Sequence, residues 1–133
     1  MPKKILVADV PELDARLVST LSGHELFFVR SLDEAVRALE HDAFDLLIIS
    51  VHFDDSRMFD LLRQARADGR NKRIPIVCVR EPDVGVTAIS RDTLEVACRA
   101  LEANAFVDLA NLKDEDERAA MLAGALKEFV RDG

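Results

Sequence analysis

Short, continuous apolar runs alternate along this chain with amphipathic stretches, and this alternation restricts the fold more than any other feature of the sequence. The segments at residues 5–8 and 45–51 are apolar through their middle, which is typical of strands buried on both faces of a sheet. Strands of that kind belong to parallel sheets with helices on both sides. The expected strands lie at residues 5–8, 26–29, 45–51, 76–79 and 106–107.

The stretches between these runs have the spacing and the punctuation of helices. Pro11 suits the first turn of a helix, and Gly23 supplies a stop after it. Ser31 and Glu34 form a capping box at the start of the next helix. The acidic residues 114–117 favour the start of the last one. Core-facing positions of the later helices include Phe59, Leu62, Ala65, Leu94, Ala97, Cys98, Leu101, Leu122, Leu126, Phe129 and Val130.

Strands that alternate with helices call for parallel strands joined by right-handed crossovers. We therefore expect a doubly wound α/β fold. The 133 residues are the length of one domain, so we expect a single domain over residues 1–133. Residues 81–90 have no clear period and are expected to form a long loop.

Composition disfavours several classes of function. Eighteen Lys and Arg against 25 Asp and Glu give a net charge of −7, so we expect no binding to nucleic acid or to an anionic membrane surface. The N-terminal apolar run is too short for a signal peptide or a membrane span, so a cytoplasmic location is expected. Cys78 and Cys98 lack the spacing of a metal-binding pair and are expected to be reduced, partly buried thiols.

In open parallel sheets, ligands bind beyond the carboxyl ends of the strands. The residues at these ends are Asp9, Ser50, Arg80 and those just after Val107. They are therefore the first candidates for a functional site.

Four segments of the chain resemble, in the same order, parts of the response regulator receiver family, the CheY-like domains: KKILVADVPEL, FDLLIISVHFDDSRMFDLLRQAR, IPIVCVRE and ANAFVDLANL. The resemblance extends over essentially the whole chain. It implies a flavodoxin-like five-stranded parallel sheet with strand order 2-1-3-4-5 and helices on both faces. It also implies an acidic pair after the first strand, a phosphoacceptor Asp at the third, Ser or Thr at the fourth and Lys at the fifth.

The residues at these positions depart from the family's pattern. Asp9 is followed by Val10, so one member of the acidic pair is missing. Ser50 stands at the phosphoacceptor position, where a hydroxyl cannot form an acyl phosphate. Arg80 replaces the hydroxyl residue, and Leu109 replaces the Lys. We expect a degenerate pocket with no catalytic residue and no cofactor, because magnesium would need about two or more carboxylates.

Some residues near this pocket have two interpretations. Arg80 either pairs with Asp9 as a permanent internal cation or extends into solvent. Phe106 matches the family's switch aromatic, but a ring at a strand start also suits the core. Asp54 and Asp55 could supply charge to a metal, and we favour a solvated loop and helix cap for them instead.

Two further features carry little weight for function. His52 belongs to no Ser-His-Asp or Cys-His pattern, and no Gly-rich phosphate loop follows the first strand. A cluster of cations around the end of the third helix favours a solvated face over a phosphate-binding patch; its members are Arg63, Arg66, Arg70, Lys72 and Arg73.

These observations predict a phosphorylation-independent, non-enzymatic receiver-like domain of a two-component pathway. Its partner would be a protein, either a histidine kinase or an output protein, and a homodimer stays possible. The partner surface is expected on residues 81–130. Two alternatives stay open: a receiver phosphorylated at a non-standard acidic site, and an unrelated small α/β enzyme or nucleotide-binding protein.

Overall fold

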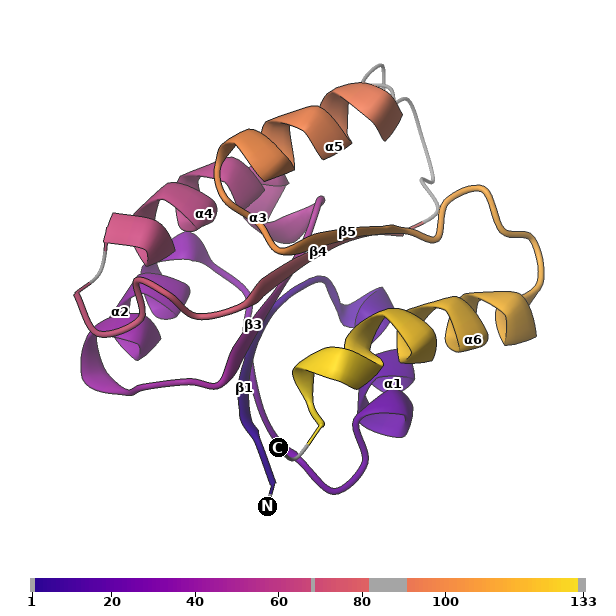
Figure 1. Cartoon of the computed structure of the whole chain (residues 1–133), viewed down its shortest axis with the longest axis horizontal. Helices are drawn as coiled ribbons and strands as arrows, with labels where there is room; N and C mark the ends of the chain where they lie inside the picture. The colour runs from indigo at the N-terminus through magenta and orange to yellow at the C-terminus, as the bar shows by residue number, and fades with distance from the viewer. Residues whose placement is uncertain (1, 68, 82–90, 132–133) are drawn as a thin grey trace.

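The computed structural model describes residues 2–67, 69–81 and 91–131, and they form a parallel sheet between two layers of helices (Figure 1). Within these ranges the five strands lie in the order β2-β1-β3-β4-β5. Their bounds are β1 Lys4–Ala8, β2 Glu25–Val29, β3 Leu46–Ser50, β4 Ile76–Arg80 and β5 Ala105–Asp108. The predicted fold class and strand order are confirmed.

The helices follow the strands in alternation. Their bounds are α1 Pro11–Thr20, α2 Leu32–His41, α3 Phe53–Ser56, α4 Met58–Ala67, α5 Arg91–Ala100, α6 Glu115–Leu126 and the 3₁₀ turn η1 Lys127–Phe129. The last nine residues of the predicted loop, 82–90, lie outside the described residues. The sequence did not predict α3, a single turn directly after β3.

The predicted helix starts are confirmed by their caps. Pro11 stands in the first turn of α1, and the Ser31 hydroxyl accepts a hydrogen bond of 3.1 Å from the Glu34 N–H. The helix α1 is followed by Gly23, whose φ of 92° is a left-handed conformation that glycine adopts without steric cost. Local sequence and tertiary structure therefore agree at these turns.

The core is divided by the sheet into two clusters of buried side chains. Leu13 and Leu17 of α1 pack with Leu122 and Leu126 of α6 against one face. Residues of α2, α4 and α5 cover the other face, as the ribbon also shows (Figure 1). All of β3 is buried, which explains why its sequence is apolar up to Ser50.

Candidate functional site

The strand register brings the predicted site residues to one edge of the sheet. Asp9 directly follows β1, Ser50 ends β3, Arg80 ends β4 and Leu109 directly follows β5. The strands are parallel and paired in register up to these positions, so their carboxyl ends lie side by side. The predicted convergence of these four residues is confirmed.

Asp9 lies buried in this edge and contacts an arginine that the sequence did not single out. Its side chain is fully buried, and Nη1 of Arg30 donates hydrogen bonds to Asp9 Oδ1 and, at 3.3 Å, to the Asp9 carbonyl. Nη2 of the same guanidinium donates to Asp14 Oδ2 on α1. We call Asp9, Asp14 and Arg30 the Asp9 cluster. One of the two interpretations of Arg80, its pairing with Asp9, was wrong, because Arg30, just past β2, reaches Asp9 from the other side.

The two acids of the Asp9 cluster have opposite pKa shifts. Burial, followed by the nearby Asp14 carboxylate, raises the pKa of Asp9 from 3.8 to about 8, although Arg30 acts in the other direction. Burial also acts to raise the pKa of Asp14, but hydrogen bonds with Arg30 and Asp9 hold it below its ordinary value. Asp9 Oδ2 and Asp14 Oδ1 are buried and accept no hydrogen bond from the described residues. A proton on Asp9 lets it donate to Asp14, so near neutral pH the pair holds one proton.

Ser50 and Val10 offer little chemistry beside the Asp9 cluster. The Ser50 side chain is fully buried, and its hydroxyl oxygen accepts a hydrogen bond of 3.3 Å from the His52 backbone N–H. Val10 is the N-cap residue of α1, and its side chain makes no capping hydrogen bond. Neither residue supplies a carboxylate to this edge of the sheet.

Arg80 and Leu109 are held by neighbours other than Asp9. Nη1 of Arg80 lies 3.4 Å from Asp108 Oδ2, and the two side chains are only 14% and 5% exposed. The alternative of an Arg80 extended into solvent was therefore also wrong. Leu109 is fully buried between the sheet and the α1 and α6 layer. The sequence could have indicated the contact between Arg80 and Asp108, because these two residues are register partners at the ends of β4 and β5.

A second arginine joins three elements near the same edge. Arg16 on α1 donates from Nη1 to both carboxylate oxygens of Glu81, at 2.7 and 2.8 Å. Its Nη2 donates to both oxygens of Glu115 at the start of α6, at 2.8 and 2.7 Å. We call Arg16, Glu81 and Glu115 the Arg16 clamp. It fixes Glu81, the residue that directly follows β4.

The loop after β3 is anchored by Asp54. Its Oδ2 accepts a hydrogen bond of 2.7 Å from the Leu32 N–H in the first turn of α2. Asp54, Asp55 and Ser56 have φ values of 44°, 54° and 65°, which are left-handed conformations that cost free energy in residues other than glycine. Asp54 thus contacts the start of α2, whose N-cap is Ser31, and does not cap the helix that follows it, as the sequence had suggested.

Phe106 lies on the outer strand β5, where it is half-buried and packs against the core cluster under α5. It also lines a groove of about 320 Å³ between β5 and α6. The other lining residues are Val107, Asp108, Asn111, Leu112, Met121 and Ala125. Both interpretations of Phe106 are compatible with this position, so its role stays a prediction.

Within residues 2–67, 69–81 and 91–131, no three His, Cys, Asp or Glu side chains gather as candidate metal ligands. Among these residues, too, there is no helix with the length and hydrophobicity that a bilayer crossing requires.

The fold of the chain is that of solved receiver domains. The phosphorylated cyanobacterial phytochrome response regulator RcpA superposes with a TM-score of 0.74 at 22% identity, over 97% of this chain and 94% of that one. The Mn²⁺-bound form of response regulator Rcp1 gives 0.78 at 18% identity, over 99% and 97%. Chemotaxis response regulator CheY4 of Vibrio cholerae gives 0.75 at 17% identity, over 98% and 100%. The chain matches no family model, and no curated protein sequence matches it as a relative. The comparisons therefore establish a receiver fold.

Proposed function

We propose that this chain is a receiver-like domain of a two-component pathway that acts without phosphorylation and without catalysis, by binding a protein partner. The observation that carries the proposal is the Arg30 guanidinium bound to buried Asp9 at the carboxyl edge of a receiver fold. This edge is where the receiver resemblance implies a phosphorylation site. In this chain that edge already holds a fixed cation, the Arg30 guanidinium.

The chemistry of phosphoryl transfer supports this proposal. The reaction depends on a positioned nucleophile and on cations that neutralise the phosphoryl oxygens. Ser50 has no carboxylate to form an acyl phosphate, and Leu109 has no charge. The reaction therefore lacks both its nucleophile and its lysine.

A magnesium ion, which the receiver fold implies, does not fit these residues. Magnesium prefers several oxygen ligands in octahedral geometry. Val10 offers no side-chain oxygen, and the Asp9 carboxyl is engaged by Arg30, whose positive charge repels a second cation.

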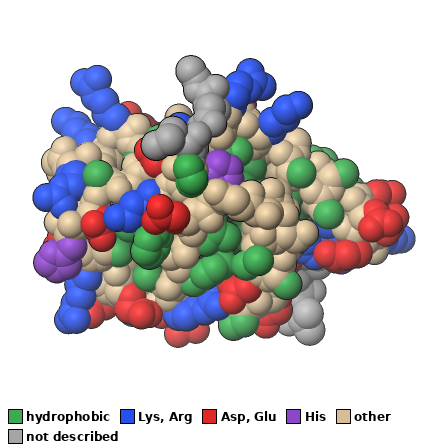
Figure 2. All heavy atoms as spheres, turned by 90° about the horizontal axis from the view of Figure 1, so that it is seen from below, with side chains coloured by type: hydrophobic (Ala, Val, Ile, Leu, Met, Phe, Trp, Pro, Cys, Tyr) green, Lys and Arg blue, Asp and Glu red, His purple; other side chains and the backbone are tan. Residues whose placement is uncertain are grey.

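The side of the molecule formed by α5, β5 and α6 is the proposed partner surface. The groove between β5 and α6 is bordered by Met121, which is 46% exposed, and Val96 of α5 is 69% exposed. Acidic side chains gather at the end of the molecule where α6 begins, from Asp114 to Glu117 (Figure 2). We therefore expect a partner that places an apolar side chain in the groove and basic residues against the start of α6.

A mass measurement and a binding measurement test the proposal together. After incubation with acetyl phosphate and magnesium, the intact mass should show no added phosphoryl group. A stable phosphoryl group on this chain would instead support the alternative of a non-standard acidic site.

Partner binding is tested by capture from the native cell, with identification of the bound protein and measurement of its affinity for purified variants. Met121→Lys should weaken the affinity about tenfold or more, because it places a charge in the apolar groove. Val18→Lys is the matched control, since Val18 is 54% exposed on α1 and does not line the groove. Equal affinities of the two variants would contradict the assigned surface.

A further inference from the structure

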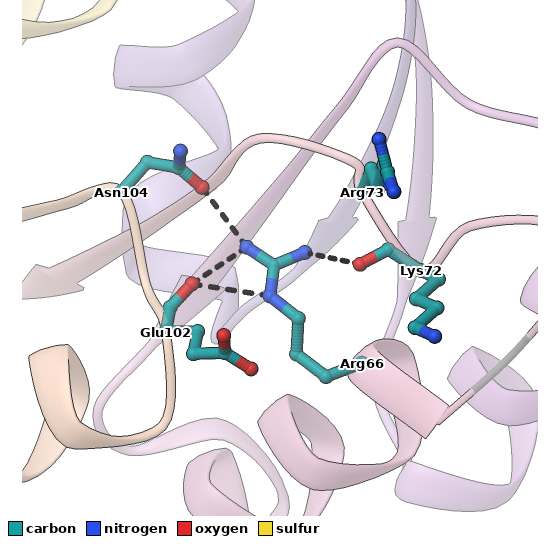
Figure 3. Close-up of a pocket in the computed structure, with 5 residues that line it drawn as sticks. All are labelled: Arg66, Lys72, Arg73, Glu102 and Asn104. Atoms are coloured by element: carbon teal, nitrogen blue, oxygen red, sulfur yellow. Dashed lines mark hydrogen bonds between the residues drawn. The ribbon is translucent and has the colours of Figure 1, made fainter.

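A pocket of about 380 Å³ lies at the opposite edge of the sheet, where β4 and β5 begin (Figure 3). Arg66 comes from the last turn of α4, and Lys72 and Arg73 come from the connection to β4. Glu102 and Asn104 come from the connection between α5 and β5. This pocket is separate from the Asp9 cluster and has no part in the proposed function.

Arg66 places a fixed positive charge against the wall of the pocket. Its Nε and Nη2 donate to the Glu102 carbonyl at 3.1 and 2.6 Å, and its Nη1 donates to the carbonyls of Lys72 and Ile74 at 3.1 and 2.6 Å. Nη2 also donates to Asn104 Oδ1 at 3.0 Å. All five N–H donors of the guanidinium are thus used, and each acceptor is a neutral oxygen. Among the described residues, no carboxylate accepts a hydrogen bond from this guanidinium.

The remaining donors around the pocket are free to bind. The side chains of Lys72 and Arg73 are exposed, and neither has an ion pair or hydrogen bond with any residue in the described ranges. Asn104 Oδ1 accepts from Arg66 and, at 2.8 Å, from the Ile76 N–H, whereas its Nδ2 has no acceptor among the described residues and is turned away from Arg66 (Figure 3). The pocket therefore offers an ammonium, a guanidinium and an amide as donors.

The structure divides the basic cluster that the sequence had indicated. Arg63 pairs with Asp60 at 3.3 Å, and Arg70 donates to the Glu40 carbonyl at 3.1 Å. The other three cations line the pocket, where Glu102 has the only acidic side chain among the described lining residues. In a chain with a net charge of −7, the described lining of this pocket combines three cations with one carboxylate.

We propose that this pocket binds a small phosphomonoester dianion. The planar fork of Arg73 can donate two parallel hydrogen bonds to a phosphate, and Lys72 adds a compact charge. The fixed charge of Arg66 attracts the anion without any change in its own contacts. A volume of about 380 Å³ is in the range of small-molecule sites and leaves room for an organic group on the phosphate.

An NMR titration of the isotopically labelled protein tests this proposal with three probes: glucose 6-phosphate, inorganic phosphate and glucose. Glucose 6-phosphate should cause saturable shifts at the backbone amides of Lys72, Arg73 and Asn104. Inorganic phosphate should shift the same amides with weaker affinity, and glucose should shift none. Shifts without saturation, shifts spread over basic residues of the whole surface, or equal shifts with glucose would overturn the proposal.

Matched charge reversals provide the second arm. Lys72→Glu combined with Arg73→Glu should weaken glucose 6-phosphate binding about tenfold or more, because charge-assisted hydrogen bonds are lost. Lys127→Glu is the control, since Lys127 is exposed on the α6 layer across the sheet, and it should leave the affinity unchanged. Spectra without ligand verify that the variants keep the fold, which we expect because all three positions are exposed. Equal loss of affinity in the double variant and the control would show unspecific attraction and overturn the site.

Discussion

Two arginines near the carboxyl edge of the sheet, Arg16 and Arg30, each contact two carboxyl groups. The two sites nevertheless differ in the protonation of their acids. In the Arg16 clamp, Nη1 and Nη2 donate to all four oxygens of Glu81 and Glu115. In the Asp9 cluster, Arg30 reaches one oxygen of each acid, and no N–H of the described residues donates to the buried Asp9 Oδ2 or Asp14 Oδ1.

This difference shows that whether a carboxyl group is charged depends more on its burial and on the number of hydrogen-bond donors around it than on the presence of an arginine. Hydrogen bonds from Arg16 are the main cause that holds the pKa of Glu115 below its ordinary value. Burial brings the pKa of Asp9 to about 8 despite the contact with Arg30. The Arg16 clamp is thus a set of fixed ion pairs, whereas the Asp9 cluster holds a proton that it can lose near neutral pH.

The largest expected difference between the two sites is in the free energy of unfolding that is lost when the arginine of each site is replaced. Arg16→Met should lower the free energy of unfolding by about 3 kcal/mol, because it leaves Glu81 buried without its cation. Arg30→Met should cost about 1 kcal/mol, because Asp9 already carries a proton at pH 7 and the Arg30 side chain is 40% exposed. Urea unfolding at pH 7 measures both. An equal or larger loss for Arg30→Met would break the comparison.

The pH dependence of stability should distinguish the same two sites. Unfolded Asp9 loses its proton near pH 4, and folded Asp9 keeps it up to about pH 8, so this residue makes the folded state bind more protons. The free energy of unfolding should therefore fall as the pH rises through this window. Asp9→Asn imitates the protonated acid and should remove this fall.

Glu115→Gln serves as the control for this pH series. Because the pKa of Glu115 is lowered, its contribution to stability is present above its ordinary value of 4.5 and is lost only in more acidic solution. The variant should keep the wild-type slope between pH 5 and 8. A slope that Asp9→Asn leaves unchanged would contradict the raised pKa of Asp9.

The smallest effect is expected for Arg80, which the sequence analysis had placed in the pocket. Arg80→Ala should cost about 0.5 kcal/mol, because at 3.4 Å its hydrogen bond to Asp108 Oδ2 is long and weak. Asp108 keeps other partners, since it accepts from the Ala110 N–H at 2.9 Å and from Asn111 Nδ2 at 3.3 Å. Thermal unfolding measures the loss. A cost as large as that of Arg16→Met would mean that Arg80 and not Arg16 holds the end of β4.

The fold could be predicted from the sequence because the signals that define its strands and helices are local. Buried parallel strands are apolar throughout, and Pro11 and Ser31 start their helices by interactions within a few residues. The edge location of Asp9 and Ser50 followed from the same reasoning.

The contacts within the site could not be predicted, because they depend on long side chains from other elements. Arg30 lies 21 residues after Asp9, and Arg16 lies 65 residues before Glu81. Many arginines in the sequence could reach this edge, and no local pattern distinguishes Arg16 or Arg30 from those at the surface. The pairing of Asp9 was therefore assigned to the wrong cation.

Amide NMR spectra with and without magnesium and beryllofluoride, a mimic of a bound phosphoryl group, test most directly whether this chain acts without phosphorylation. We expect the spectra to superimpose, because Arg30 already engages Asp9 and Ser50 offers no carboxylate. Specific, saturable shifts at Asp9 and at residues 50–52 would contradict it and would show that this edge still binds the metal and the phosphoryl group.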